Sequence, residues 1–233
     1  MIDIKGKHAV ITGISKGIGR ALAKKLLDNG VTVTGWGQSE PDYKHENLRF
    51  IKTNVRDQHS VNHAAEQTLA TGNVDYLINN AGLGYFNFLE KMPDEQITQM
   101  LETNINGVIY CTKALIGNMK ANETGHVINL SSTAGIEGMP QVAVYCATKW
   151  AVRGFTEALF KEVRNFGIKV TAVYPGAIAT NFFDNTPGME PHAGMLDVNE
   201  VADQLITLMQ QSPNFCTNHL VFRPLQPKKY AKG

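Results

Sequence analysis

Short apolar runs alternate with longer amphipathic stretches along almost the whole chain, and this alternation constrains the fold more than any other feature. Several of the short runs carry β-branched residues at consecutive positions, as strands covered on both faces do. Such alternation indicates a parallel sheet with helices on both faces. We expect strands at residues 8–12, 31–35, 48–53, 76–79, 126–130, 169–174 and 220–222, and helices at residues 18–29, 60–69, 93–120, 144–166 and 199–210.

Local signals predict where some of these elements begin and end. Gly30 follows the first helix as a stop residue, and Asn199 is the expected N-cap of the last helix. The long segment 93–120 reads as two helices that meet near Asn106-Gly107. The connection between the second and third strands, residues 36–47, is a poor helix former, so we expect a loop or a single turn there.

Length and composition favour one cytoplasmic domain spanning residues 1–233. With 22 basic and 21 acidic residues, the net charge of +1 gives no reason to expect nucleic acid or an anionic membrane as partner. No stretch is apolar enough to cross a bilayer, and the N-terminus lacks a secretory apolar region. Three widely spaced cysteines favour a reducing compartment. His59 and His63 lack an apparent third ligand, so no metal site is expected.

A glycine-rich turn follows the first expected strand and opens the first helix. Glycines permit a tight turn and close approach of a ligand, and the helix N-terminus attracts a pyrophosphate. The alternative is a strand-to-helix turn that is glycine-rich without binding anything. If the turn binds a dinucleotide, the contacts come from Gly13, Ser15, Lys16, Gly17, Ile18 and Gly19.

The spacing of this turn resembles that of the short-chain dehydrogenase/reductase family, and further motifs extend the resemblance from residue 7 to about residue 222. These motifs are Asn79-Asn80-Ala81-Gly82, Asn104 in TNINGV, Ser131-Ser132, Tyr145-Cys146-Ala147-Thr148-Lys149 and Pro175-Gly176-Ala177-Ile178-Ala179-Thr180. The resemblance implies a single doubly wound, Rossmann-like α/β domain. It also implies a mostly parallel seven-stranded sheet with the strand order 3-2-1-4-5-6-7.

Tyr145 and Lys149 are the expected centre of the chemistry. On a helix, residues i and i+4 share a face, so the lysine can lie beside the tyrosine. A nearby ammonium should lower the phenol pKa and suit Tyr145 to proton transfer. The resemblance makes Ser132, rather than Ser131, the residue that polarises the substrate oxygen. It makes Asn104 part of a proton relay; a helix-interior Asn bonded to backbone is the equal alternative.

The resemblance also implies a nicotinamide cofactor. Its contacts would be the glycine turn with Asn54, Val55, Asn80, Ala81, Gly82, Tyr145, Lys149, Pro175, Gly176, Ile178 and Thr180. Asn54 stands where relatives usually carry an Asp, and Asn80 has bracing of the sheet as an alternative role. The second strand ends in Trp36-Gly37-Gln38 without an acid for the ribose 2′-hydroxyl, and Lys16 is available for a 2′-phosphate. These residues favour NADP over NAD, with Glu40 or Asp42 as acids that could reverse the preference.

The expected activity is hydride transfer between NAD(P)(H) and a carbonyl or secondary alcohol, a small-molecule substrate. Phe86 and its neighbours, together with the stretch of about 181–198 that resembles the family's substrate loop, suggest an apolar substrate wall. Core packing or a subunit interface would also explain these apolar residues. The other functional readings are an NAD(P)-binding regulator without turnover and an epimerase or dehydratase of similar fold. Family precedent favours a homodimer or homotetramer.

Overall fold

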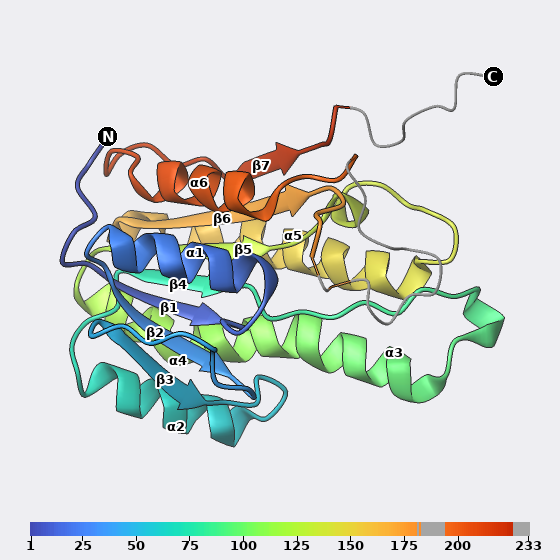
Figure 1. Cartoon of the computed structure of the whole chain (residues 1–233), viewed down its shortest axis with the longest axis horizontal. Coiled ribbons are helices and arrows are strands. Elements are labelled where there is room, and N and C mark those ends of the chain that lie inside the picture. Colours follow the sequence, from blue (N-terminus) through green and yellow to red (C-terminus); the bar gives the residue numbers. More distant parts are fainter. Residues whose placement is uncertain (181, 183–193, 226–233) are drawn as a thin grey trace.

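A computed structural model describes residues 1–180, Phe182 and residues 194–225. The described strands form one seven-stranded sheet in the order β3-β2-β1-β4-β5-β6-β7, and every neighbouring pair is parallel (Figure 1). This confirms the α/β class and the strand order. The strands are β1 (His8–Thr12), β2 (Thr32–Gly37), β3 (Leu48–Lys52), β4 (Tyr76–Asn79), β5 (Gly125–Leu130), β6 (Ile168–Pro175) and β7 (His219–Phe222).

Helices cover both faces of the sheet (Figure 1). The α-helices are α1 (Gly17–Asp28), α2 (Gln58–Leu69), α3 (Asp94–Leu101), α4 (Gly107–Ala121), α5 (Ala143–Val163) and α6 (Val198–Met209). A π-helical turn, η2 (Glu102–Asn106), joins α3 to α4. Three short 3₁₀ turns are η1 (Leu89–Lys91), η3 (Thr133–Gly135) and η4 (Arg164–Phe166). Within the described residues, no helix is both long and apolar enough to span a bilayer.

Alternate residues of the central strands pack into two separate hydrophobic cores, one on each face of the sheet. Ile11 of β1 packs in the cluster that α1 and α6 cover, whereas Val10 packs in the cluster that α2, α4 and α5 cover. In β4, Ile78 and Leu77 divide in the same way. Because both faces of these strands are buried, the strands read as continuous apolar runs.

The predicted helix ends are correct at α1 and wrong at α6. Gly30 has φ +72°, its N–H binds the Leu27 carbonyl at 2.9 Å, and the Val31 N–H binds the Leu26 carbonyl at 3.0 Å. These two bonds form a Schellman motif, which requires the left-handed residue. At α6 the cap is Asp197, not Asn199, because the Asp197 carboxylate accepts hydrogen bonds from the amides of residues 199 and 200.

The predicted break between the helices of segment 93–120 is confirmed, but its form is different. The chain continues through the π turn η2, and the Gly107 N–H bonds to the Glu102 carbonyl five residues back. Gly107 packs against Val55, which follows β3: a Cβ added to Gly107 would be 3.0 Å from Cγ2 of Val55. The turn therefore falls where the helix meets the residues that follow β3.

The connection between β2 and β3 contains no helix, as predicted. It is tied to α1 by Arg20, whose guanidinium bonds both carboxylate oxygens of Asp42 at 3.0 and 3.1 Å. The guanidinium also lies 5.6 Å from the centre of the Tyr43 ring. Asp42 is thus held by a cation of α1.

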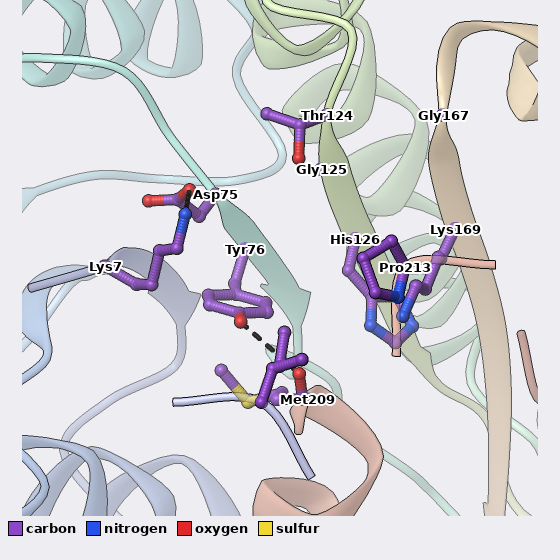
Figure 2. Close-up of a pocket in the computed structure, with 11 residues that line it drawn as sticks. Lys7, Asp75, Tyr76, Thr124, Gly125, His126, Gly167, Lys169, Met209 and Pro213 are labelled. Atoms are coloured by element: carbon purple, nitrogen blue, oxygen red, sulfur yellow. Dashed lines mark hydrogen bonds and ion pairs between the residues drawn. The ribbon is translucent and has the colours of Figure 1, made fainter. Parts of the chain in front are cut away.

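A cavity of about 90 Å³ lies near the amino ends of the strands, away from the edge where the sequence motifs converge. Figure 2 shows side chains of β4, β5, β6 and the end of α6 around it. His126 is 3% exposed there, and its Nε2 lies 2.8 Å from Oγ1 of Thr171. Since that hydroxyl donates its proton to the Thr217 carbonyl, Nε2 carries the histidine proton. Nδ1 is then an acceptor, buried and without a partner among the described residues.

Candidate active site

The carboxyl ends of the strands border a pocket of about 550 Å³, the edge at which open α/β sheets bind ligands. Most of the residues predicted from the sequence line it. They are Gly13, Ser15, Lys16, Gly17, Ile18, Asn80, Ala81, Gly82, Ser132, Tyr145, Lys149, Pro175, Gly176, Ile178 and Thr180. Four predicted residues are not among those lining it: Gly19, Asn54, Val55 and Asn104. Of the expected substrate loop, residues 181 and 183–193 lie outside the described residues.

Tyr145 and Lys149 occupy the start of α5 and are 7% and 6% exposed. The lysine Nζ lies 5.6 Å from the centre of the phenol ring and donates a hydrogen bond to the Leu130 carbonyl at 2.8 Å. The backbone of β5 thereby fixes the ammonium beside the phenol. The helical spacing brings the two side chains together, as the sequence predicted.

Ser132 and Ser131 have different surroundings. The Ser132 side chain lies close enough to the Tyr145 phenol to lower its pKa, and Ser132 Oγ accepts from the Ala134 N–H at 3.1 Å. Ser131 is 4% exposed, and its hydroxyl donates to the Lys149 carbonyl at 3.0 Å. Ser132 is therefore the serine beside the phenol, whereas Ser131 holds α5 against the end of β5.

Burial dominates the titration of both central groups. It raises the pKa of Tyr145 above its usual value of about 10, and the nearby Ser132 side chain opposes this rise only in part. Burial also lowers the pKa of Lys149 to about 8. The expectation that the ammonium depresses the phenol pKa is therefore wrong for this arrangement, because desolvation is the largest cause. At neutral pH the tyrosine is a protonated donor.

Asn104 lies in the π turn and is 1% exposed. Its amide both accepts from the Leu83 N–H at 3.0 Å and donates to the Leu83 carbonyl at 2.8 Å. It also donates to Thr148 Oγ1 at 3.1 Å. A Cβ on Gly82 would lie 3.3 Å from Asn104 Oδ1 and 3.6 Å from Lys149 Nζ, so both polar groups lie just behind this glycine. Asn104 thus connects η2, the segment after β4, and α5.

The glycine turn offers backbone donors to an anion. Gly13 and Gly17 have φ values of +71° and +54°, which disfavour any side chain. Lys16 is the N-cap of α1, but its side chain makes no capping hydrogen bond, and the first turn of α1 carries no acid. The first amides of α1 thus lack a side-chain cap, an arrangement that suits a pyrophosphate. This chemistry and the volume of the pocket fit a dinucleotide.

Asn80 braces the same turn. Its Nδ2 donates to the carbonyls of Thr12 and Gly13 at 2.9 and 3.0 Å. Oγ1 of Thr12 accepts from the backbone amides of residues 80 and 81. A Cβ on Gly19 would collide with the Gly13 carbonyl and with Asn80, so Gly19 is a packing residue. Sequence reasoning missed Thr12, whose position at the end of a strand carries no distinctive signal.

The residues at the ends of β2 and β3 are not among the described residues that line the pocket. Asn54 Oδ1 accepts from the Arg56 N–H at 3.2 Å and from Gln38 at 3.5 Å, which links the two strand ends. Val55 is buried in the core cluster that α2, α4 and α5 cover. Of the two acids that could favour NAD, Asp42 is bonded to Arg20 and Glu40 is exposed.

The far side of the pocket is apolar and aromatic. Phe86 stands edge-on to Tyr145 with ring centres 5.5 Å apart, and Phe182 lies 5.8 Å from the same phenol. The expected apolar wall is present at these two residues. Three further lining residues that sequence reasoning missed are Met139, Pro140 and Val142. Their place between Ser132 and Tyr145 in the sequence is the signal that would have identified them.

Comparisons with known proteins agree with this geometry. The family model described as short chain dehydrogenase matches residues 7–190. A 3-oxoacyl-(acyl-carrier-protein) reductase of Haemophilus influenzae is 37% identical over 185 residues, which cover 76% of each chain. An alcohol dehydrogenase of Thermococcus sibiricus, solved with 5-hydroxy-NADP, has TM-score 0.85 and 28% identity over 96% of this chain and 99% of its own. A 3-ketoacyl-(acyl-carrier-protein) reductase of Brucella melitensis, solved with NADH, has TM-score 0.88 and 25% identity over 97% and 100%.

Proposed function

The chain belongs to the short-chain dehydrogenase family and is an NAD(P)-dependent oxidoreductase, and we propose that Tyr145, Lys149, Ser132 and Asn104 carry its reaction. The reaction interconverts a carbonyl and a secondary alcohol. The observation that carries the proposal is the phenol of Tyr145, which is buried and protonated, lies beside Ser132 and has the Lys149 ammonium 5.6 Å from its ring centre. A phenol so placed can deliver a proton to an oxygen in the pocket.

The residues divide the work of carbonyl reduction as follows. When bound, the nicotinamide supplies the hydride to the carbonyl carbon. Ser132 donates a hydrogen bond to the carbonyl oxygen, and Tyr145 transfers its phenolic proton to that oxygen. The Lys149 ammonium stabilises the phenolate that remains. Alcohol oxidation reverses each step.

Asn104 acts by position. Its hydrogen bonds to Leu83 and Thr148 hold the segment after β4 against the helix that carries the tyrosine and lysine. Contacts with the cofactor are proposed for the glycine turn, for residues 80–82 and for the segment 175–180, all of which line the pocket. Asn54 and Val55 are proposed to flank the adenine.

NADP is the favoured cofactor, with NAD as the other candidate. Lys16 lines the pocket at the glycine turn, where its ammonium can meet a 2′-phosphate. The exposed Gln38 follows β2 in place of an acid, and Asp42 is neutralised by Arg20. Lys16 would therefore attract the 2′-phosphate, and the carboxylate of Asp42, which is paired with Arg20, would repel it less than a free acid.

Substitution of Tyr145 tests the assignment. Tyr145→Phe removes the proton donor and keeps the ring, so turnover should fall by roughly 10²–10⁴-fold while NADPH affinity changes little. Tyr110→Phe, on α4 and away from the pocket, is the matched control. NADPH absorbance follows turnover across a panel of aldehydes, ketones and 3-oxo esters. A Tyr145→Phe protein that keeps most of its turnover would remove this residue from the chemistry.

The assembly proposed is a homodimer or homotetramer of a single domain. Ile109 of α4 and Trp150 of α5 are large apolar side chains that are 36% and 46% exposed, which favours burial against a second copy. Light scattering should give a mass of two or four times 25.6 kDa, whereas a monomer would contradict the proposal. The three free cysteines support a cytoplasmic location, and the net charge of +1 supports a small-molecule substrate rather than nucleic acid or membrane.

A further inference from the structure

The wall around the reacting oxygen is built from aromatic rings. Phe86 and Phe182 each lie within 6 Å of the Tyr145 ring centre, and their own ring centres are 6.3 Å apart. Other apolar residues extend this wall: Ala134, Met139, Pro140, Val142 and Ile178. A substrate whose carbonyl oxygen reaches Tyr145 must therefore place one substituent against apolar surface.

Cations that could bind a substrate carboxylate are scarce on this side. Among the described lining residues only Lys16 and Lys149 are charged. Lys16 belongs to the glycine turn, and Lys149 is already bonded to the Leu130 carbonyl.

Arg223 is a cation at the rim. It follows β7, and its Cα would lie 3.8 Å from a Cβ added to Gly176, a residue of the pocket lining. Both terminal nitrogens of its guanidinium bond the Glu137 carboxylate, at 3.2 and 2.6 Å. Glu137 belongs to the loop between Ser132 and Tyr145 that also supplies Met139 and Pro140 to the wall. The pair cancels the charge of the arginine at the pocket rim.

We propose that the substrate is an uncharged carbonyl compound with an apolar chain of several carbons, that Phe86 and Phe182 select this chain, and that Glu137 suppresses binding of carboxylates by neutralising Arg223. This inference rests on the proposed function, since it assumes that the carbonyl meets Tyr145. It goes beyond that function by assigning substrate selectivity to Phe86, Phe182 and Glu137, none of which transfers a proton.

The test compares matched substrates with NADPH. Methyl 3-oxohexanoate and the 3-oxohexanoate anion share their carbonyl and chain and differ in charge. The ester should have the higher kcat/KM by roughly 100-fold, because an unpaired carboxylate loses hydration in an apolar pocket. Methyl 3-oxobutanoate, two methylenes shorter, should be the poorer ester by about fourfold per methylene.

Variants assign the selectivity to residues. Phe182→Ala should reduce the advantage of the longer ester, mainly through KM. Glu137→Gln should raise kcat/KM for the anion relative to the ester by roughly threefold to tenfold, because it frees Arg223. The double variant Glu137→Gln/Arg223→Ala should lose this gain. Asp203→Asn breaks an exposed ion pair between α1 and α6 and is the control that should leave both ratios unchanged.

The outcomes separate this inference from the proposed function. Equal kcat/KM for anion and ester, or equal values for the long and short esters, would overturn it, even if Tyr145→Phe abolished turnover as expected. If no ester is reduced, calorimetric titration into the complex with NADP⁺ decides the matter. Binding of the ester in preference to the anion would support the apolar site, and failure of the ester to bind would overturn it.

Discussion

At the scale of single residues, burial outweighs proximity in setting the chemistry of the site. The sequence places Lys149 one helical turn after Tyr145, and from that spacing an ammonium-driven fall in the phenol pKa is a natural expectation. Both groups are almost completely buried, so desolvation raises the phenol pKa and lowers the lysine pKa to about 8. The group that titrates near working pH is therefore the lysine.

The pH profile of carbonyl reduction should report this lysine. At saturating NADPH, kcat/KM should be level below pH 8 and fall as the pH rises through about 8, because Lys149 loses the charge that stabilises the phenolate. Lys149→Arg retains a charge at all these pH values and should move the fall to higher pH. A wild-type profile that stays level to pH 10 would show that the lysine charge is not required.

His126 links a single buried side chain to the stability of the whole protein. Burial, assisted by Lys169, lowers its pKa from 6.5 to about 3. The unfolded chain therefore takes up this proton first as the pH falls, so the contribution is complete above pH 6.5 and is lost progressively toward pH 3. At pH 4.5 the loss should be on the order of 2–3 kcal/mol.

Denaturant unfolding between pH 7 and pH 4.5 measures this loss. His126→Gln should flatten the pH dependence of the free energy of unfolding, whereas the same change at the exposed His59 should leave it as it is in the wild type. Nδ1 of the neutral imidazole is buried and has no hydrogen-bond partner among the described residues, so folding favours the neutral ring mainly through burial. An unchanged slope in His126→Gln would refute the assignment.

At the scale of elements, the periodicity of apolar residues predicts whether a helix or strand is present better than it predicts the residues at which the element begins and ends. The end of α1 was predictable because a glycine in a Schellman motif leaves a sequence signature, and Gly30 carries it. The start of α6 was not, since Asp197 and Asn199 are both good caps, and only the backbone at residue 197, extended rather than helical, decides between them. The π turn has no signature in residue type at all.

The cap of α6 also bears on the pocket. Leu196, just before it, exchanges backbone hydrogen bonds with residues 177 and 179, which follow β6 beside the pocket. Asp197→Ala should lower the free energy of unfolding by about 1 kcal/mol, as loss of a cap does. Asn199→Ala should cost less, because its side chain is not the cap. Equal losses in urea titrations of the two variants would contradict the assignment.

At the scale of the whole molecule, the alternation of strands and helices sufficed for the layers, and the family resemblance supplied the strand order. Neither the alternation nor the resemblance predicts which loop residues line the pocket. Asn54 and Val55 stay predicted cofactor contacts, but they are not among the residues that line the pocket. Met139 lies between two motifs in the sequence, but which residues of that loop line the pocket depends on the path of the loop in three dimensions.

Cofactor binding should stabilise the entire fold, because the pocket is formed by segments from β1, β4, β5, α5 and β6. A ligand at 100 times its Kd adds about 2.7 kcal/mol, and for a chain of this size that raises Tm by roughly 5–10 °C. NADPH should give a larger shift than NADH at equal concentration. Lys16→Ala should reduce the NADPH shift more than the NADH shift, and Lys113→Ala on α4 should change neither.

Thermal unfolding followed by circular dichroism measures these shifts. A larger shift with NADH would reverse the cofactor preference and point to Glu40, the exposed acid that follows β2. Equal shifts in wild type and Lys16→Ala would show that the ammonium does not meet the 2′-phosphate.

The π turn at Glu102–Asn106 has a consequence for how the gene can change in length. A π turn holds one residue more than an α turn, so deletion of a single codon within it would leave an uninterrupted α-helix. Such a helix would keep its regular backbone hydrogen bonds, but α3 would be rotated by about 100° relative to α4. Asn104 would lose its alignment with Leu83 and Thr148. The deletion would thus make the helix regular but disable the site. This stretch should therefore accept substitutions more readily than deletions.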